Sequence, residues 1–305
     1  MESTGMQPTG DQFALRHGDY TAIVTEVGAT LRSLTYGDRP LVAGFAADAP
    51  MPEFNGALLA PWPNRIGDGR YDFDGRTHQL PISEPSRNTA LHGFVAWQPW
   101  AATEVSADAV RLETVVWPQR GYPFLLTLAA HYALGAEGLT MELSARNDGS
   151  TPAPFGISMH PWFVAGAVPL ADWQLTVPAA KVVTTDDRLL PTGIEPVAGE
   201  LDYRLGRPLG ATRLDHTFTG VIFTAGRAAA TVVAPDGTGV EVTWDESCPW
   251  LQVCTGDEAG PDLNRRAIAI EPMTGPPDAF RSGVDIVRLE PGRSFETTWR
   301  IAAVG

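Results

Sequence analysis

The sequence contains little of what several protein classes require. Its 305 residues include two cysteines, Cys248 and Cys254, which are too few for a disulfide framework or a cysteine-built zinc site. We expect both thiols to be reduced, and Cys254 has the setting of a packed strand residue. No apolar run reaches the roughly 18 residues of a membrane-spanning helix. The N-terminal stretch MESTGMQPTGDQ has neither the basic segment nor the apolar core of a signal peptide, so we expect a cytoplasmic protein.

Positive charge is also scarce. Lysine occurs once, at Lys181, the formal net charge is −14 and the pI is about 4.8. Nucleic acids and anionic membrane surfaces are bound through basic patches. We therefore expect neither as a partner, and the charge also argues weakly against highly anionic substrates.

Cofactor motifs are missing as well. The chain has no HExxH sequence, no GxSxG elbow and no Walker loop, and its six histidines do not fall at metal-ligand intervals. The glycines of GDGRYDFDG lack the strand-then-helix setting of a dinucleotide fingerprint. The sequence therefore predicts no metal and no nucleotide cofactor.

Short segments with period-two hydrophobicity fill the space between 31 glycines and 26 prolines. With 44% hydrophobic and 19% charged residues, the composition is that of a soluble globular protein. The pattern predicts strands at 20–28, 30–37, 110–117, 125–134, 139–147, 173–177, 219–225, 230–234, 240–244, 250–254 and 295–304, and a hairpin at 71–80. No convincing amphipathic helix occurs, which favours an all-β sandwich or barrel.

No repeat, linker or shift in composition marks a boundary in the chain. We therefore expect a single domain over residues 1–305, with about the first ten residues loose. The connections around 45–70, 83–95 and 185–217 are longer than a hairpin needs. Long loops on a rigid sheet are common places for binding sites.

The stretch AIAIEPMTGPPDAF, residues 267–280, places Glu271 at the end of an apolar run. Burying an unpaired carboxylate is costly, so such a group is usually paired, hydrogen-bonded or protonated. Three interpretations stay open at this point: a buried ion pair, a strand end that reaches water, and a catalytic acid or base.

Two histidines have settings that could move their pKa about neutral pH. His92 lies in TALHGFVAW and His160 in GISMHPWF, both among small, apolar or aromatic residues. Taken singly, each is typical of a hydrogen-bonded structural histidine. The alternative for each is an acid, a base or a ligand-holding group.

A set of short motifs becomes informative when its members are taken together. The set contains PWPNRIGDG, ALHG, ISMHPWF, RLDHTF, LQVCTG and AIAIEPMTG. This order resembles that of the aldose 1-epimerase (galactose mutarotase) family, from about residue 20 to the C-terminus. The wording of PWPNRI and HPWF is most similar to a bacterial branch of that family with poorly defined sugar specificity.

The resemblance implies an antiparallel β-supersandwich with a sugar cleft across one sheet. It implies Glu271 as general base and His160 as general acid. It also implies that five residues hold and polarise the sugar: Asn64, Arg65, His92, Asp215 and Gln252. For two of these a structural role is the alternative, since Asp215 could pair with His216 and Arg65 could brace a loop.

The chain departs from the family pattern at Phe94, Met159 and Trp162, which line the sugar pocket in that pattern. The substrate therefore stays open among glucose, galactose, a sulfonated hexose and rarer sugars. Of the nine tryptophans, we expect four to lie at the motif loops, where indoles can stack on sugars, and three to lie in the core. The first group is Trp62, Trp97, Trp100 and Trp162, and the second is Trp117, Trp244 and Trp299.

The implied reaction explains why a carboxylate and an imidazole are needed. Opening a hemiacetal ring takes a proton from the C1 hydroxyl and delivers one to the ring oxygen, which a carboxylate and an imidazolium can do at neutral pH. We expect a mutarotase acting on a free aldohexose or a related sugar, as a monomer or homodimer. The alternatives are a hexose-6-phosphate epimerase, which would need a basic rim, and a non-catalytic sugar sensor. A glycosidase would need two opposed carboxylates.

Overall fold

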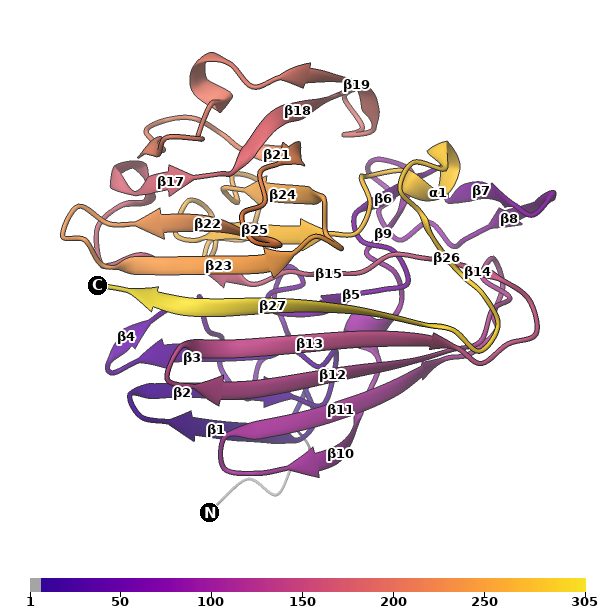
Figure 1. Ribbon diagram of the computed structural model, residues 1–305, viewed down its shortest axis with the longest axis horizontal. Helices are drawn as coiled ribbons and strands as arrows, with labels where there is room; N and C mark the ends of the chain where they lie inside the picture. The colour runs from indigo at the N-terminus through magenta and orange to yellow at the C-terminus, as the bar shows by residue number, and fades with distance from the viewer. Residues whose placement is uncertain (1–6) are drawn as a thin grey trace.

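A computed structural model describes residues 7–305 and confirms the all-β prediction. Its largest unit is a nine-stranded antiparallel sheet (Figure 1). In spatial order the strands are β10 (Ala101–Val105), β11 (Ala109–Val116), β12 (Leu126–Gly135), β13 (Gly138–Asn147), β27 (Ser294–Val304), β23 (Gly239–Asp245), β22 (Arg227–Val233), β17 (Gln174–Thr176) and β20 (Arg207–Pro208).

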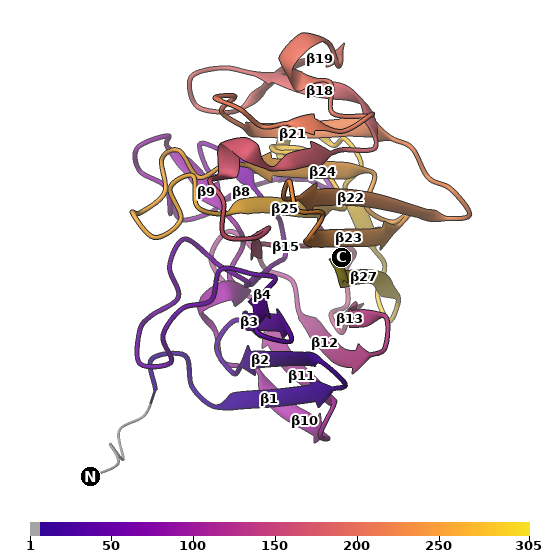
Figure 2. The same cartoon turned by 90° about the vertical axis from the view of Figure 1, so that its left-hand side faces the viewer.

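Two smaller sheets complete the layers. The six-stranded sheet has the order β16 (Trp162–Phe163), β25 (Ile268–Met273), β24 (Trp250–Cys254), β21 (Asp215–Val221), β18 (Ala179–Thr185) and β19 (Pro191–Pro196). The four-stranded sheet contains β1 (Gln12–His17), β2 (Tyr20–Thr25), β3 (Leu31–Tyr36) and β4 (Arg39–Pro40). Figures 1 and 2 show the four-stranded sheet against β11 to β13 and the six-stranded sheet beside β22 and β23.

The remaining elements are short. Four two-stranded ladders are β5 (Leu58–Leu59) with β15 (Ser158–Met159), β6 (Arg65–Gly67) with β9 (Thr89–Leu91), β7 (Arg70–Phe73) with β8 (Arg76–Gln79), and β14 (Ala153–Phe155) with β26 (Val287–Leu289). Three 3₁₀ turns cover Val95–Trp97, Leu170–Asp172 and Gly199–Leu201, and helix α1 covers Ala279–Ser282. None of the helices in residues 7–305 is long and apolar enough to cross a membrane.

Alternating burial along the long strands explains why they form. In β12 the side chains of Leu126, Leu128, Ala130 and Tyr132 are fully buried, whereas Thr127 and His131 between them are only partly buried. Side chains on a strand alternate between its two faces, so one face of the sheet is apolar and packs inward. One connected hydrophobic core includes residues from Leu15 to Ile301.

Some individual predictions fail. Trp117 was expected in the core, but it follows the end of β11 and is 67% exposed. Trp244 and Trp299 are fully buried, as expected. Of the N-terminal residues expected to be loose, residues 1–6 lie outside the described part. Thr9 is buried and its carbonyl accepts a hydrogen bond from the Val27 N–H.

Candidate active site

Neighbouring strands of the six-stranded sheet bring one set of polar residues together. Gln252 on β24 lies directly opposite Glu271 on β25 and Thr217 on β21. Residues paired across antiparallel strands point to the same face, and so do residues two apart on one strand. Asp215, Thr217, Gln252 and Glu271 therefore share one face, although 56 residues of sequence separate the first from the last.

Glu271 lies within a strand whose six residues are all buried. Its side chain is 2% exposed, and its Oε2 atom has no hydrogen-bond partner. Its Oε1 atom is 3.6 Å from Nε2 of His160, which is longer than a hydrogen bond. The carboxyl group is thus held by the sheet while its own hydrogen-bonding capacity remains unused.

His160 lies between β15 and β16 and is fixed through its backbone. Its N–H donates to the Ala57 carbonyl at 3.0 Å, and its carbonyl accepts from the Gly56 N–H at 2.9 Å. The imidazole is 8% exposed, and its Nδ1 atom is buried without a hydrogen-bond partner. Its other ring nitrogen, Nε2, is the one that faces the Glu271 carboxyl group.

Burial controls the charge of this pair. Burial, helped by the charge of Arg65 and opposed by a backbone hydrogen bond, lowers the pKa of His160 to about 4. Burial raises the pKa of Glu271 well above its ordinary value, and the charge of Asp215 adds to this, whereas Arg65 opposes it. Although the pair lies within ion-pair distance, both shifts favour neutral groups. Of the two groups, Glu271 is therefore the one that keeps a proton to higher pH.

His92 and Asn64 fix each other across the β6–β9 ladder. The Asn64 N–H donates to Nδ1 of His92 at 3.1 Å, and the His92 N–H donates to the Asn64 carbonyl at 2.9 Å. Burial, followed by the charges of His160 and Arg65, lowers the pKa of His92 well below its ordinary value. The ring is therefore neutral, and since Nδ1 accepts a hydrogen bond, its proton is on Nε2.

Close packing of the backbone explains why glycine follows His92 in the LHG motif. Gly93 has φ = 70°, and a Cβ atom at this position would lie 2.0 Å from the Ala60 carbonyl oxygen. Only glycine fits so close an approach of two backbone segments. His92 itself has φ = 60°, in the left-handed region. The left-handed backbone conformations of His92 and Gly93 together thus set the position of the His92 ring.

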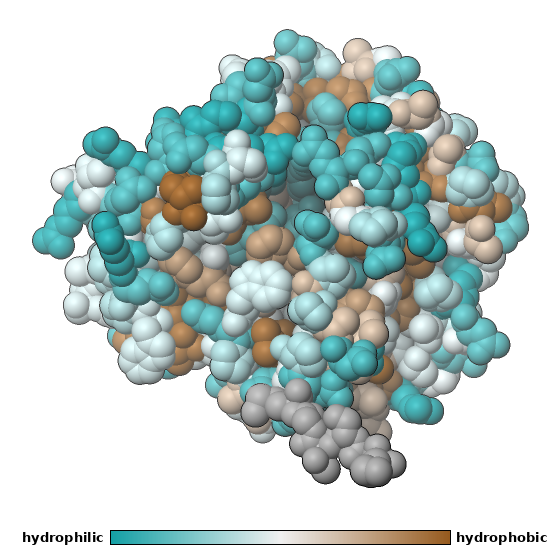
Figure 3. Space-filling model, turned by 180° about the vertical axis from the view of Figure 1, so that it is seen from behind, coloured by the Kyte–Doolittle hydropathy of each residue, from teal (hydrophilic) through white to brown (hydrophobic). Residues whose placement is uncertain are grey.

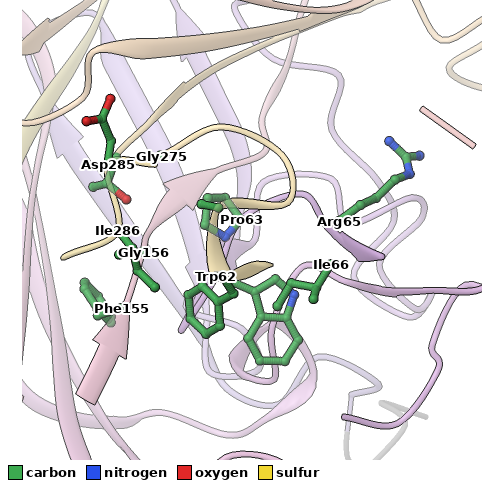
Figure 4. Close-up of a pocket in the computed structure, with 12 residues that line it drawn as sticks. Trp62, Pro63, Arg65, Ile66, Phe155, Gly156, Gly275, Asp285 and Ile286 are labelled. Carbon is green, nitrogen blue, oxygen red and sulfur yellow. The ribbon is translucent and has the colours of Figure 1, made fainter. Parts of the chain in front are cut away.

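Arg65 begins β6 and faces away from the hydrophobic core. Figure 4 shows its guanidinium directed away from Trp62 and Pro63. Its Nε and Nη2 atoms donate to the two carboxylate oxygens of Glu84, at 2.9 and 3.1 Å. Its backbone carbonyl accepts from the Asp278 N–H at 2.7 Å, and an Asp278 carboxylate oxygen accepts from the Gly67 N–H at 2.8 Å. Asp278, near the end of the 267–280 stretch, thus holds the strand that carries Arg65.

Asp215, Gln252 and Thr217 form a chain of hydrogen bonds with one consistent arrangement. The Gln252 Nε2 donates to Asp215 Oδ1 at 2.5 Å, because a carboxylate can only accept. The Gln252 Oε1 must then face Thr217, whose hydroxyl donates to it. Thr217 therefore fixes the orientation of the Gln252 amide, and Asp215 retains a second oxygen.

These residues line a cleft of about 430 Å³, within the usual range for small-molecule sites. The cleft brings together all seven residues expected from the sequence: Asn64, Arg65, His92, His160, Asp215, Gln252 and Glu271. The space-filling view in Figure 3 shows a hollow near the middle of the face seen from behind. The small cavity of Figure 4, at about 10 Å³, has room for no more than about one water molecule.

The aromatic predictions are only partly right. Trp162 lines the cleft and its ring centroid is 5.5 Å from that of His160. Trp62 and Trp100 are buried in the core, and Trp97 is exposed outside the cleft lining. Phe94 and Met159, expected at the sugar pocket, also lie outside the lining. Phe94 packs on Trp62, with ring centroids 4.8 Å apart.

Sequence reasoning missed several lining residues. Phe54 packs its ring 4.8 Å from that of His92, between centroids, and no motif signalled it. Glu84 comes from the 83–95 connection, whose length was the only sign of a site. Cys254, expected to be a packed strand residue, is partly exposed and lines the cleft. Within residues 7–305 no three His, Cys, Asp or Glu side chains are grouped as a metal site.

Comparisons with known proteins show which sequences and which fold the chain is similar to. The aldose 1-epimerase family model matches residues 11–302. The uncharacterized protein YihR of Escherichia coli K12 is 34% identical over 303 residues, which cover 99% of this chain and 96% of YihR. Galactose mutarotase of Rattus norvegicus is 29% identical over 70% of this chain and 69% of its own length. The crystal structure of a GalM/aldose epimerase homologue from C. elegans superimposes with a TM-score of 0.84 at 21% identity, covering 97% and 99% of the two chains.

Proposed function

The chain belongs to the aldose 1-epimerase family, and on that premise we propose that it is a mutarotase acting on a free aldohexose or a related sugar. One observation supports the proposal most strongly. Glu271 and His160 are buried 3.6 Å apart, and each has a polar atom without any partner. A binding protein gains nothing from burying two such groups, whereas proton transfer requires them.

The proposed reaction opens and recloses the sugar ring. Glu271 accepts the proton of the C1 hydroxyl while His160 delivers a proton to the ring oxygen. The C1–C2 bond then rotates and the two roles reverse as the ring closes on the other face. Each such proton transfer is worth about 10² to 10⁴ in rate, or about 3 to 5 kcal/mol.

The resting proton must move before this reaction begins. Burial favours a protonated Glu271 and a neutral His160. Hydroxyl groups of an entering sugar supply the hydrogen bonds that an ionised carboxylate needs, so we propose that sugar binding shifts the proton from Glu271 to His160. The pair then holds one proton at all times, as a reversible reaction requires.

The other cleft residues have proposed roles in holding the sugar. The Nε2–H of neutral His92 is a donor, and the second oxygen of Asp215 is an acceptor. Asn64, Arg65 and Gln252 surround the same space. The proposed partner is thus a neutral small sugar, and the proposed setting is the cytoplasm.

A hexose phosphate is less well matched. A basic rim could draw on Arg70, Arg87 and Arg120, but of these three arginines only Arg87 lines the cleft. Its guanidinium donates to two glutamates, Glu84 at 3.1 Å and Glu258 at 2.8 Å. A cation already paired in this way offers little to a phosphate group.

Anomer exchange measured by NMR tests the proposal. Wild-type protein should accelerate the exchange of glucose, galactose or a related free sugar, and Glu271→Gln should lose at least a hundredfold of that rate. Glu142→Gln is the matched control, because Glu142 also approaches a histidine, His131 at 3.4 Å, but on the nine-stranded sheet. Sugar binding without acceleration would identify a sensor, and a preference for glucose 6-phosphate would identify the phosphate-specific alternative.

A further inference from the structure

Glu84 receives an unusual number of hydrogen bonds for a residue that no motif contains. Its side chain is 12% exposed, and it accepts from Nε and Nη2 of Arg65, from Nη1 of Arg87 at 3.1 Å and from the Thr89 hydroxyl at 2.6 Å. A carboxylate has about four acceptor positions, so these donors saturate it. Glu84 is therefore oriented from several sides.

The backbone around Glu84 is equally fixed. Its N–H donates to the Thr89 carbonyl at 3.0 Å, and its carbonyl accepts from the N–H groups of Thr89 and Arg87. Burial raises the pKa of Glu84, but hydrogen bonds from Arg65 and Thr89 and the charges of Arg65 and Arg87 outweigh it, so the net pKa is lowered. The group is ionised at neutral pH and holds a fixed place on the cleft wall.

Arg65 is the partner whose geometry depends on this carboxylate. Two of its three guanidinium nitrogens bond Glu84, and no hydrogen bond within residues 7–305 involves the third, Nη1. Arg65 lines the cleft and its charge acts on His92, His160 and Glu271. A flexible arginine would have to be ordered before it could meet a ligand, whereas a forked contact with a carboxylate orders it beforehand.

We propose that Glu84 is a positioning residue for the sugar site: it holds Arg65 so that Nη1 is presented to the cleft as a hydrogen-bond donor. This inference rests on the proposed function, because it takes a sugar as the ligand of Arg65. A merely structural role would be to fold the 83–89 turn. In that case the loss of Glu84 would affect stability but would not act on the sugar through Arg65.

Steady-state anomer exchange separates these roles. Glu84→Gln should raise KM roughly tenfold, the effect of a charged hydrogen bond, and change kcat less than twofold. In an Arg65→Ala background the same substitution should change kcat/KM less than twofold, since its target is already gone. Glu84→Asp keeps the charge of the turn but shortens the side chain, and should give a similar increase in KM.

Asp74→Asn is the matched control. Asp74 accepts hydrogen bonds from Nη1 and Nη2 of Arg288, at 2.6 and 2.9 Å, so it also holds an arginine through both carboxylate oxygens, but away from the cleft. This variant should leave KM and kcat unchanged. The proposal would be overturned if Glu84→Gln left KM unchanged, or if its effect persisted in the Arg65→Ala background. Either result would leave the proposed mutarotase function intact, provided that the wild type accelerates anomer exchange.

A spectroscopic measurement tests the positioning without any activity. The Nε–H signal of Arg65 in a ¹⁵N NMR spectrum, assigned by its loss in Arg65→Lys, should be sharp and downfield in the wild type and shifted in Glu84→Gln. If the wild type accelerates no sugar, the proposed function fails, and a shifted signal still supports the positioning of Arg65. A signal that stays in place in Glu84→Gln shows that Glu84 does not hold Arg65.

Discussion

Replacing Glu271 by glutamine should stabilise the protein while removing its activity, and the stabilisation should grow with pH. The carboxyl group is 2% exposed, one oxygen has no partner, and the other lies 3.6 Å from His160. Ionising a group in this setting is unfavourable. Glutamine has a similar shape and cannot ionise, so the variant avoids that penalty.

The direction of the pH effect follows from the raised pKa of Glu271. In the unfolded chain a glutamate titrates near pH ~4.3. In the folded protein burial raises the pKa of Glu271, with a further contribution from Asp215. The folded state therefore retains a proton that the unfolded state has lost, and stability falls as pH rises from ~4.3 to the folded pKa. The Glu271→Gln variant does not have this decrease in stability with pH, because glutamine does not titrate.

His160 gives the opposite slope in the same pH region. Burial lowers its pKa to about 4, below the unfolded value of ~6.5. Its contribution is therefore present above pH ~6.5 and is lost as pH falls toward 4. His160, Asp215 and Arg65, the charged or titratable groups that act on Glu271, are present in both proteins. The difference in stability between the two proteins isolates Glu271.

The magnitude can be worked out per pH unit. Within its titration window one group changes the free energy of unfolding by about 1.4 kcal/mol per unit. A chain of 305 residues has an unfolding entropy of about 0.6 kcal/mol per kelvin. The difference in Tm should therefore grow by about 2 °C for each pH unit above ~4.3, up to the folded pKa of Glu271.

Differential scanning calorimetry of both proteins between pH 4 and 8 measures this difference. Glu142→Gln is the control, because Glu142 is an exposed glutamate near His131, and its Tm should follow that of the wild type. A Tm difference for Glu271→Gln that is independent of pH would show that Glu271 titrates normally. A variant less stable than wild type at pH 8 would contradict the argument altogether.

Three further substitutions test the supporting contacts. Thr217→Val leaves the buried Gln252 amide oxygen without its donor. The variant should therefore lose about 1 to 3 kcal/mol of the free energy of unfolding, measured by denaturant unfolding, and show a raised KM in the kinetics of anomer exchange. Asp278→Ala removes the acceptor of the Gly67 N–H and places alanine at φ = 62°, for a loss of about 2 kcal/mol that Asp278→Asn should largely avoid. Trp117→Ser should change stability by less than about 0.5 kcal/mol, whereas a core tryptophan would lose several.

The sequence predicts the fold wherever alternation is strong. The segments 110–117, 125–134 and 139–147 become β11, β12 and β13 within a residue at each end. The missed strands are those whose pattern is weak or whose length is two or three residues, such as β5 and β16. Such strands exist because tertiary packing supplies a partner, which no local pattern records.

Tryptophan positions show the limit of reasoning from neighbours in sequence. Trp62 and Trp100 are close to motif residues, yet their rings pack into the core. Trp117 was expected at the end of an apolar strand, but β11 ends at Val116 and the Trp117 side chain is exposed. Each error is a matter of which face of a strand or loop a side chain takes. A shift of one residue reverses that face.

The seven expected cleft residues were within reach of the sequence because each lies in a distinctive short motif. Thr217 and Glu84 were not, since their importance depends on pairing. Thr217 matters because it lies opposite Gln252, and Glu84 because the β6–β9 ladder brings Arg65 beside its turn. Register across strands and contacts between connections come from the whole fold. No window of the sequence contains them.

The turn that carries Phe54 is the least predictable part of the cleft and is closely tied to His160. Glu53 and Phe54 both have left-handed backbones, with φ of 45° and 55°, which side chains of their size rarely adopt. The next residues hold the turn in place: Asn55 accepts from the Trp162 N–H, and the Gly56 N–H donates to the His160 carbonyl at 2.9 Å. Strain of this kind persists only where surrounding contacts impose it. The turn at Glu53 and Phe54, whose backbone conformation is intrinsically unfavourable, therefore helps to hold His160 beside Glu271.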